Sequence, residues 1–399
     1  MLFKVLGAVL LCASATVASA QTLPAEPVSL GDGRVVVSGD ASVSVAPEDT
    51  GFFNYGDYEH SMLREFRLGL SVAVRATDRI SILGQIRSEN MDTPEPYALY
   101  ARLRPFVHHR FDVQIGRIPP TFGRFPRLAY GRDNILIGYP LAYQYLTSLR
   151  ADALPASVDE LLRMRGRGWL ANYSVGNLAA DRGVPLVNAL NWDTGVEAST
   201  GWKWLDVSAA VTNGTVSRPL VSDDNAGKQF AGRAMVHFSP ALSVGASYAR
   251  GAFVSRRVLA ALELPSDRSF VQEAAGLDVG YEAGHLSIQA EAIGSSWDVP
   301  MRATGTIVAL QSGSISVQGR YAISPGIYAA VRAEHLTFNR VTGSSGPVSW
   351  DAPVSRVEVG GGYYLQRNLI ARMSVQFNDR DGGRVSSARL VAAQLLFWF

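Results

Sequence analysis

Cysteine, lysine and long apolar runs are all scarce in this chain of 399 residues. The single cysteine, Cys12, lies near the N-terminus, so the rest of the chain has no disulfide, thiol nucleophile or thiolate metal site. Beyond residue 20, no apolar run reaches the length of about 18 residues that suggests a membrane-spanning helix. The formal net charge is only +2, which does not indicate a nucleic-acid-binding surface.

The N-terminal segment has the pattern of a secretory signal peptide. Lys4 precedes a short apolar stretch, and the segment closes on small residues that end at Ala20. A short apolar core before an A-x-A site is typical of a signal that is cleaved on export. We therefore expect residues 1–20 to be removed and residues 21–33 to form a short periplasmic leader.

Most of the remaining chain alternates between apolar and polar residues with a period of two. Residues 34–46, 66–74 and 369–378 show the pattern, which predicts β-strands. The polar face of such strands carries full charges, as at Arg320 and Arg372. One apolar and one charged face suit a barrel whose outside meets lipid and whose inside holds water. Short and long connections also alternate, as expected for periplasmic turns and extracellular loops.

The strand-like segments between residues 34 and 399 predict one domain, an all-β transmembrane antiparallel barrel. We count about 16 strands, and a further alternating stretch in residues 168–190 leaves about 18 as an alternative. An open sheet edge would leave backbone groups unpaired in lipid, so the last strand should pair with the first. A closed barrel of this size encloses an aqueous channel.

The C-terminal segment, residues 390–399, alternates and places Phe397 and Phe399 on its apolar face. It resembles the C-terminal strand of bacterial outer-membrane proteins. That resemblance implies recognition by the barrel-assembly machinery and a location among the lipids of a Gram-negative outer membrane. Other aromatic residues fall near predicted strand ends, where membrane barrels carry aromatic girdles. They are Tyr97, Phe111, Trp192, Trp202, Phe230, Phe238, Tyr281, Tyr321 and Phe377.

A long connection, at about residues 118–187, follows the fifth predicted strand. Connections of this length in a compact domain are usually functional. Its Pro120-Thr121-Phe122-Gly123 segment resembles the third loop of the 16-stranded porins, which folds into the barrel and narrows it; Thr121 stands where that family has an acidic residue. Residues 114–117 are similar to a segment of the phosphate-selective porins. The resemblance implies a constriction loop and a homotrimer.

Charged residues on neighbouring strands and in this loop are the candidate pore-lining groups. Alternation points Arg67, Arg87, Arg102 and Arg104 inward, where we expect a positive wall across from the loop. The remaining candidates are Arg117, Arg124, Arg127, Arg132, Asp133, Asp152, Asp159 and Glu160. Arginines outnumber acids in the loop, which predicts a mild preference for anions. Alternatively, the wall arginines are ordinary lumen residues paired with Glu65, Glu89 or Asp112.

The sequence carries no pattern for catalysis or for a cofactor. The six histidines are scattered among predicted loops, turns and strands, with no Ser-His-acid arrangement. We expect no enzyme activity, metal or cofactor. The sequence therefore predicts a porin for passive diffusion of small hydrophilic solutes. The alternatives are a substrate-specific channel, for phosphate or oligosaccharides, and a non-conducting barrel that acts as an adhesin or scaffold.

Overall fold

The computed structural model describes residues 26–399 apart from 57–60, 107 and 126–130. The predicted signal peptide lies outside the described residues.

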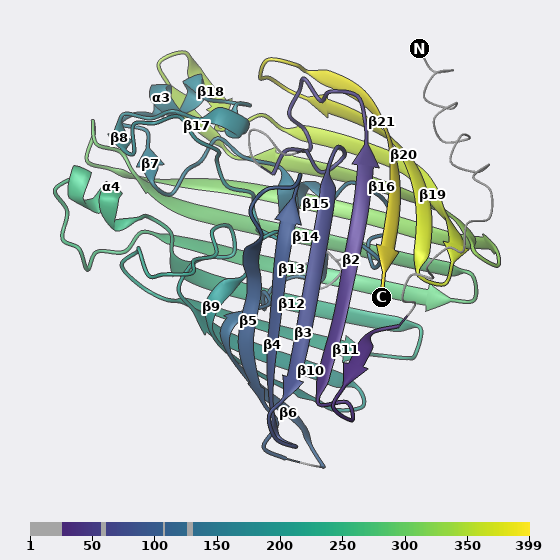
Figure 1. Cartoon of the computed structure of the whole chain (residues 1–399). Helices are drawn as coiled ribbons and strands as arrows, with labels where there is room; N and C mark the ends of the chain where they lie inside the picture. Colours follow the sequence, from purple (N-terminus) through teal and green to yellow (C-terminus); the bar gives the residue numbers. More distant parts are fainter. Residues whose placement is uncertain (1–25, 57–60, 107, 126–130) are drawn as a thin grey trace.

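Sixteen strands of the described chain form a closed antiparallel barrel (Figure 1). Each strand pairs with its neighbours along the chain, and the two ends of the sheet meet. The barrel strands are β2 (Val35–Val45), β3 (Phe66–Arg75), β4 (Ile80–Glu89), β5 (Glu95–Leu103), β6 (Arg110–Ile118), β9 (Asp193–Gly201), β10 (Leu205–Thr212), β11 (Gln229–His237), β12 (Leu242–Ala252), β13 (Val271–Ala283), β14 (Leu286–Pro300), β15 (Ile307–Ser324), β16 (Ile327–Phe338), β19 (Val354–Gln366), β20 (Leu369–Arg380) and β21 (Ser387–Trp398).

The predicted closure between the last strand and the first is confirmed. β21 pairs antiparallel with β2, and Phe397 lies opposite Ala41. Phe399 continues the pairing, because its N–H donates to the carbonyl of Gly39 at 3.0 Å. The predicted leader contributes one short strand, β1 (Val28–Leu30), which pairs with the start of β2. No strand edge of the barrel is therefore left open, as a lipid environment requires.

Alternation along the strands separates an apolar outer face from a polar inner face. Leu99, Leu277 and Ile315 point outward, and each exposes more than half of its surface. Inward positions of the same sheet carry buried charges such as Arg332 and Glu358. The exposed apolar band matches the face that a membrane barrel turns to lipid.

The connections at one end of the barrel are short turns, whereas those at the other end carry the remaining elements (Figure 1). These elements are α2 (Leu141–Gln144), β7 (Ala153–Leu154), α3 (Val158–Arg163), η3 (Gly168–Leu170), β8 (Val175–Gly176), α4 (Arg256–Ala261), β17 (Arg340–Gly343) and β18 (Gly346–Ser349). Residues 168–190 add no barrel strand, since β8 pairs only with β7. No helix in the described part of the chain is long and apolar enough to span a membrane.

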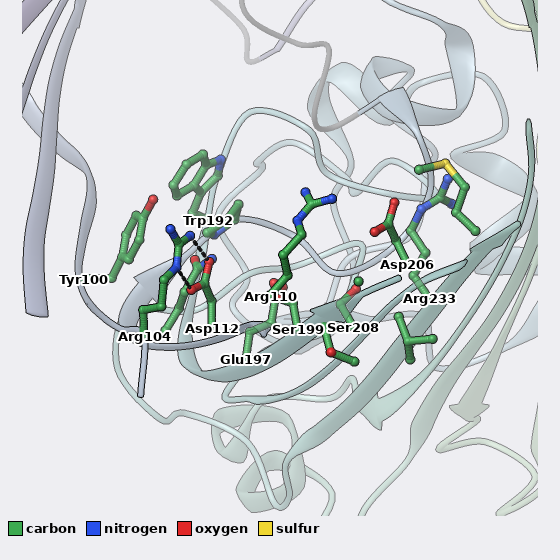
Figure 2. Close-up of a pocket in the computed structure, with 16 residues that line it drawn as sticks. Tyr100, Arg104, Arg110, Asp112, Trp192, Glu197, Ser199, Asp206, Ser208 and Arg233 are labelled. Carbon is green, nitrogen blue, oxygen red and sulfur yellow. Dashed lines mark hydrogen bonds and ion pairs between the residues drawn. The ribbon is translucent and has the colours of Figure 1, made fainter. Parts of the chain in front are cut away.

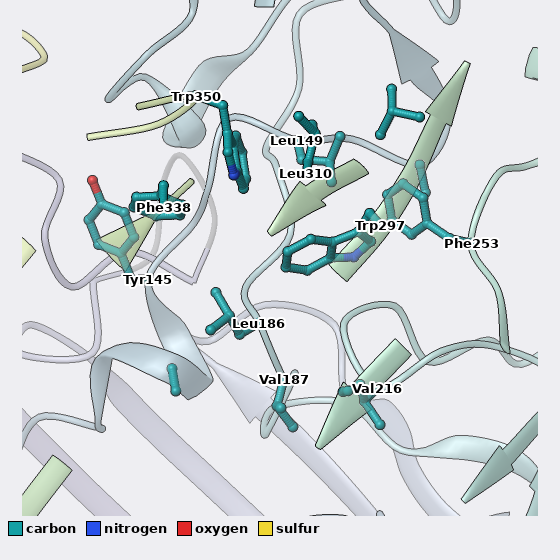
Figure 3. Close-up of a cluster of buried hydrophobic side chains, with 14 of the residues drawn as sticks. Tyr145, Leu149, Leu186, Val187, Val216, Phe253, Trp297, Leu310, Phe338 and Trp350 are labelled. Atoms are coloured by element: carbon teal, nitrogen blue, oxygen red, sulfur yellow. The ribbon is translucent and has the colours of Figure 1, made fainter. Parts of the chain in front are cut away.

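An apolar cluster fills the loop end of the barrel. Figure 3 shows Leu186 and Val187 of the long connection gathered with Trp297 of β14, while Trp350 follows β18. The rings of Trp297 and Trp350 meet edge to face at 6.1 Å between centroids. Both tryptophans are fully buried, and so are Leu186 and Val187, so the long connection packs against the strands as a folded unit.

The predicted aromatic girdles need one correction. Phe230, Phe238 and Trp202 are more than half exposed on the outside, as expected, but Tyr97 and Trp192 are buried inside, at 7% and 6% exposure. The register of β4 with β5 shifts at Tyr97, which has no partner between Pro96 and Ala98. An extra residue in one strand reverses the facing of its side chain, which simple alternation misses.

Candidate functional site

The long connection between β6 and β9 lies against the inner face of the barrel. The N–H of Gly123 donates to Ser247 Oγ on β12 at 3.0 Å. Further along, the N–H of Leu141 donates to Glu334 Oε1 on β16 at 2.8 Å. The hydroxyl of Tyr143 donates to Glu291 Oε1 on β14 at 2.6 Å. The connection therefore occupies the lumen beside the strands from β12 round to β20.

Buried arginines of the inner wall fasten this segment through its backbone carbonyls. Arg356 Nη1 donates to the carbonyl of Tyr139 at 3.2 Å, and Arg372 Nη1 donates to that of Gly131 at 2.6 Å. Arg380 reaches the hydroxyl of Tyr145 at 3.3 Å. A charged donor satisfies a loop carbonyl that water cannot reach. Sequence reasoning placed arginines on the lumen side but gave none of these a tethering role.

Acidic partners alternate with these arginines across neighbouring strands. Arg332 lies opposite Glu358 in the register of β16 with β19, and Glu334 lies opposite Arg356. Arg332 Nη1 is 3.5 Å from Glu358 Oε2, and both side chains are fully buried. The opposed charges offset one another, so the wall holds the loop without a net charge at this point.

The predicted positive wall divides into two groups. Arg67 and Arg87 lie near the loop end, where Glu89 Oε1 is 3.3 Å from Arg67 Nε and 3.9 Å from Arg87 Nη1. Arg67 Nη2 is also 2.8 Å from Glu65 Oε2, and its Nη1 donates to the hydroxyl of Tyr139 at 3.0 Å. The pairing with Glu65 and Glu89 is the alternative that the sequence left open.

The other two arginines lie at the turn end of β5. Arg102 is opposite Gln114, and Arg104 forms two hydrogen bonds with the Asp112 carboxylate, at 2.7 and 2.8 Å. Arg102 of β5 lies opposite Ser81 near the start of β4, whereas Arg87 lies near the end of β4 and opposite Glu95. The four arginines therefore do not form the single wall that we predicted.

The candidates in the first part of the loop lie on different surfaces. Arg124 Nη1 donates to Ser243 Oγ at 3.1 Å and is 3.9 Å from Asp278 Oδ1. Arg132 and Asp133 pair with each other at 3.7 Å and are both exposed. Arg127 lies outside the described residues.

The acids of the second part of the loop do not face the predicted wall. Asp152 Oδ2 is 2.9 Å from Arg150 Nη2 within the loop. Asp159 accepts the N–H of Ser344 at 2.7 Å, and Glu160 accepts the hydroxyl of Ser174 at 2.8 Å. Asp159 therefore joins the long connection to the residues between β17 and β18, whereas Asp152 and Glu160 hold the long connection to itself. Asp152 lines a cavity of about 370 Å³.

The pKa of Asp152 reflects that packing. Burial of the carboxyl opposes its ionisation, but hydrogen bonds from Arg150 and Asn177 hold its pKa below the ordinary value. The carboxylate therefore stays charged and keeps its partners at neutral pH.

Two contacts place the ends of the long connection. The hydroxyl of Thr121 donates to the Glu197 carboxylate of β9, so a wall residue supplies the acid that the loop itself lacks. Arg117 Nε donates to the carbonyl of Trp192 at 3.1 Å, and its Nη1 also donates to the carbonyl of Pro96. Sequence reasoning missed Glu197, which gave no signal beyond its inward position on a strand.

Cavities remain beside β4–β6 and β9–β11. The turn-side cavity measures about 500 Å³ and includes Tyr100, Arg104, Arg110, Trp192, Glu197 and Asp206 in its lining (Figure 2). The loop-side cavity measures about 260 Å³ and includes Arg87, Tyr97, Arg117, Arg182 and Asn191. A third cavity of about 370 Å³ shares Arg117, Arg182 and Asn191 with the loop-side cavity. In the described residues, no group of three or more His, Cys, Asp or Glu is placed to hold a metal ion.

This architecture is the 16-stranded fold of the Gram-negative outer-membrane porins. Salmonella typhi OmpF, solved with daunomycin, is 11% identical over 92% of this chain and 97% of its own, with a TM-score of 0.56. An anion-selective porin from Comamonas acidovorans is 10% identical over 92% and 99%, with a TM-score of 0.56. The channel DcaP of Acinetobacter baumannii is 10% identical over 94% and 100%, with a TM-score of 0.55. No family model and no curated protein sequence matches the chain.

Proposed function

We propose that this protein is a channel of the Gram-negative outer membrane through which small hydrophilic solutes diffuse passively. The observation that carries the proposal is the pair of cavities, lined by charged side chains, on either side of Trp192 within a barrel whose outer face is apolar. Structures with the same fold include porins and an outer-membrane channel. The proposal assigns no catalytic step and no cofactor to the lumen.

The same proposal covers export and assembly. Residues 1–20 act as a cleaved signal peptide, and the strand that carries Phe397 and Phe399 is recognised by the barrel-assembly machinery. The ring of Phe399 lies close to Gly39, so the strand that is recognised also closes the barrel. A homotrimer is proposed because a structure with this fold, OmpT of Vibrio cholerae, has been solved in a trimer form.

Charge selectivity follows from the residues that reach the cavities. Arginines and acids line the three larger cavities in nearly equal number among the described residues. Several loop arginines are already engaged; Arg150, for example, is buried against Asp152. This balance supports a weakly selective pore, and the mild anion preference inferred from the arginine count stands as the hypothesis to be measured.

Reconstitution into planar bilayers tests the proposal. Purified barrel, identified by its heat-modifiable migration, should give discrete conductance steps. Its reversal potential under a salt gradient should be small and, on the anion hypothesis, of the sign that anion permeation produces. A cation-selective reversal potential would refute the anion preference alone. Folded protein without conductance would refute the channel and favour the non-conducting barrel.

A further inference from the structure

The cavities lie on either side of one aromatic side chain. Trp192 lines the turn-side cavity, whereas its neighbours Leu190 and Asn191 line both cavities on the loop side. Arg117, which also lines the loop-side cavity, donates to the carbonyl of Trp192. A route between the two ends of the lumen along this wall therefore passes Trp192.

Two tyrosines of β5 complete an aromatic cluster around this residue. The ring centroid of Trp192 is 5.2 Å from that of Tyr97 and 6.3 Å from that of Tyr100. Tyr97 faces the loop-side cavity and Tyr100 the turn-side cavity. The guanidinium of Arg87 stacks 3.6 Å from the centroid of Tyr97. The cluster is apolar at its centre and charged on both sides.

The backbone that carries Trp192 is fixed from both directions. Asp193 accepts the N–H groups of Gly214 at 2.9 Å and Leu220 at 3.0 Å. Asn188 Oδ1 accepts the N–H groups of Leu190 at 2.9 Å and Asn191 at 3.0 Å. Because the backbone is held, the indole can change position only by rotation about its side-chain bonds.

The long connection occupies the opposite side of the lumen, beside β16, β19 and β20. Residues 131–145 are tethered there to β16, β19 and β20 by the buried side chains of Arg332, Arg356 and Arg372. The turn-side and loop-side cavities lie beside β4–β6 and β9–β11. The lumen is therefore asymmetric: one side is filled by the loop and the other carries the cavities.

We infer that the side chain of Trp192 sets the width of the solute passage and thereby the size limit of the channel. The inference rests on the proposed function and extends it, because it names a residue beside the barrel wall that determines the specificity of the channel. Acids and arginines occur in equal number in the linings of the two cavities. Passage beside Trp192 should therefore depend on the cross-section of a solute more than on its charge. The solute class that it sorts is neutral hydrophilic molecules of graded size.

The test compares wild type with Trp192→Ala, Trp192→Phe and a control, Trp204→Ala. Trp204 is 60% exposed at the turn before β10, so its removal deletes an indole without touching either cavity. Single-channel conductance and liposome swelling in neutral sugars, from pentoses to trisaccharides, are measured on heat-modifiable protein. Trp192→Ala should raise conductance severalfold and admit larger sugars, and Trp192→Phe should fall between it and wild type. The control should match wild type.

The outcomes separate the inference from the proposed function. A conducting wild type with unchanged conductance and sugar limit in Trp192→Ala would overturn the inference and leave the channel intact. If wild type does not conduct but Trp192→Ala does, the result would support the inference and show that the indole of Trp192 closes the passage. Silence of every folded variant would overturn both. If Trp192→Ala does not fold, Trp192→Phe and Tyr100→Ala are measured in its place. Tyr100 is the less buried partner in the contact between Tyr100 and Trp192, so its removal should disturb folding less.

Discussion

The guanidinium of Arg332 donates a hydrogen bond of 2.8 Å to the backbone carbonyl of Gly138, a residue 194 positions earlier in the chain. Its ion-pair partner Glu358 accepts the N–H of the same glycine at 3.1 Å. This pair of opposite charges thus provides hydrogen-bond partners for both the carbonyl and the N–H of Gly138. The loop is held at a position that side chains of the barrel wall define, so the shape of the lumen depends on these contacts.

Gly138→Ala should loosen the loop. A Cβ there would lie 2.9 Å from Glu358 Oε2 and closer still to Gln376 Nε2, both of which are fully buried. We expect the loop to shift away from β19, which should increase current noise in a bilayer and the rate of proteolysis within residues 131–145. Gly294→Ala is the matched control, because nothing lies within 4 Å of its added Cβ. Equal proteolysis and noise in the two variants would contradict the tethering role.

Arg233→Ala should destabilise the barrel through a buried charge left without its partner. Arg233 and Asp278 are joined by hydrogen bonds of 2.6 and 2.9 Å, and both are almost fully buried. Breaking such a pair costs about 3–5 kcal/mol, and we expect a value near 3 kcal/mol because Arg124 remains close to Asp278. Denaturant unfolding from lipid vesicles measures the change.

The control for this substitution is Lys228→Ala. Lys228 and Asp223 form an ion pair of 2.6 Å with side chains 42% and 38% exposed. Exposed pairs contribute less than about 1 kcal/mol. A loss for Arg233→Ala as small as that for Lys228→Ala would show that the buried pair does not stabilise the fold.

Asp351, in the connection between β18 and β19, should give stability a pH dependence. Its carboxylate accepts the N–H groups of Ser148 at 2.5 Å and Gly166 at 2.7 Å. Burial raises the pKa of Asp351 above the ordinary value of 3.8, against the opposing effect of these bonds. The folded protein then binds the proton more tightly than the unfolded chain. Its stabilising contribution is therefore complete below the unfolded pKa and falls as pH rises through the raised value.

Comparison of wild type with Asp351→Asn isolates this dependence. The difference in unfolding free energy should be largest near about pH 4 and should shrink as pH rises. Asp223→Asn provides a control of opposite sign, because the hydrogen bond from Lys228 lowers the pKa of Asp223. That contribution is present above the unfolded pKa and is lost as pH falls. A difference for Asp351→Asn that grows with pH would be incompatible with a raised pKa.

Arg110→Glu should shift selectivity toward cations. In Figure 2 its guanidinium points into the turn-side cavity between Asp112 and Asp206. Reversal of its charge leaves acids in excess there, which favours cations in an aqueous passage. Reversal potentials of wild type, Arg110→Glu and the opposite change Asp206→Arg should lie in order of the net charge. Identical potentials would place the passage away from this cavity.

The sequence predicted the barrel well because its signals are local. Period-two alternation identified all sixteen barrel strands. It could not show that Arg67 and Arg87 share Glu89 while Arg104 pairs with Asp112 at the far end. Those groupings depend on strand direction and on how far each side chain reaches.

The sequence by itself determined the fold class, the closure of β21 on β2 and the facing of most side chains, because these follow from strand periodicity and from the need to pair every edge. Only the tertiary structure decided the path of the long connection. That path depends on contacts such as the hydrogen bond from Arg332 to Gly138, two residues far apart in the sequence. A register shift, also set by packing, turns Tyr97 toward Trp192. Such contacts are set by three-dimensional packing, which no local pattern encodes.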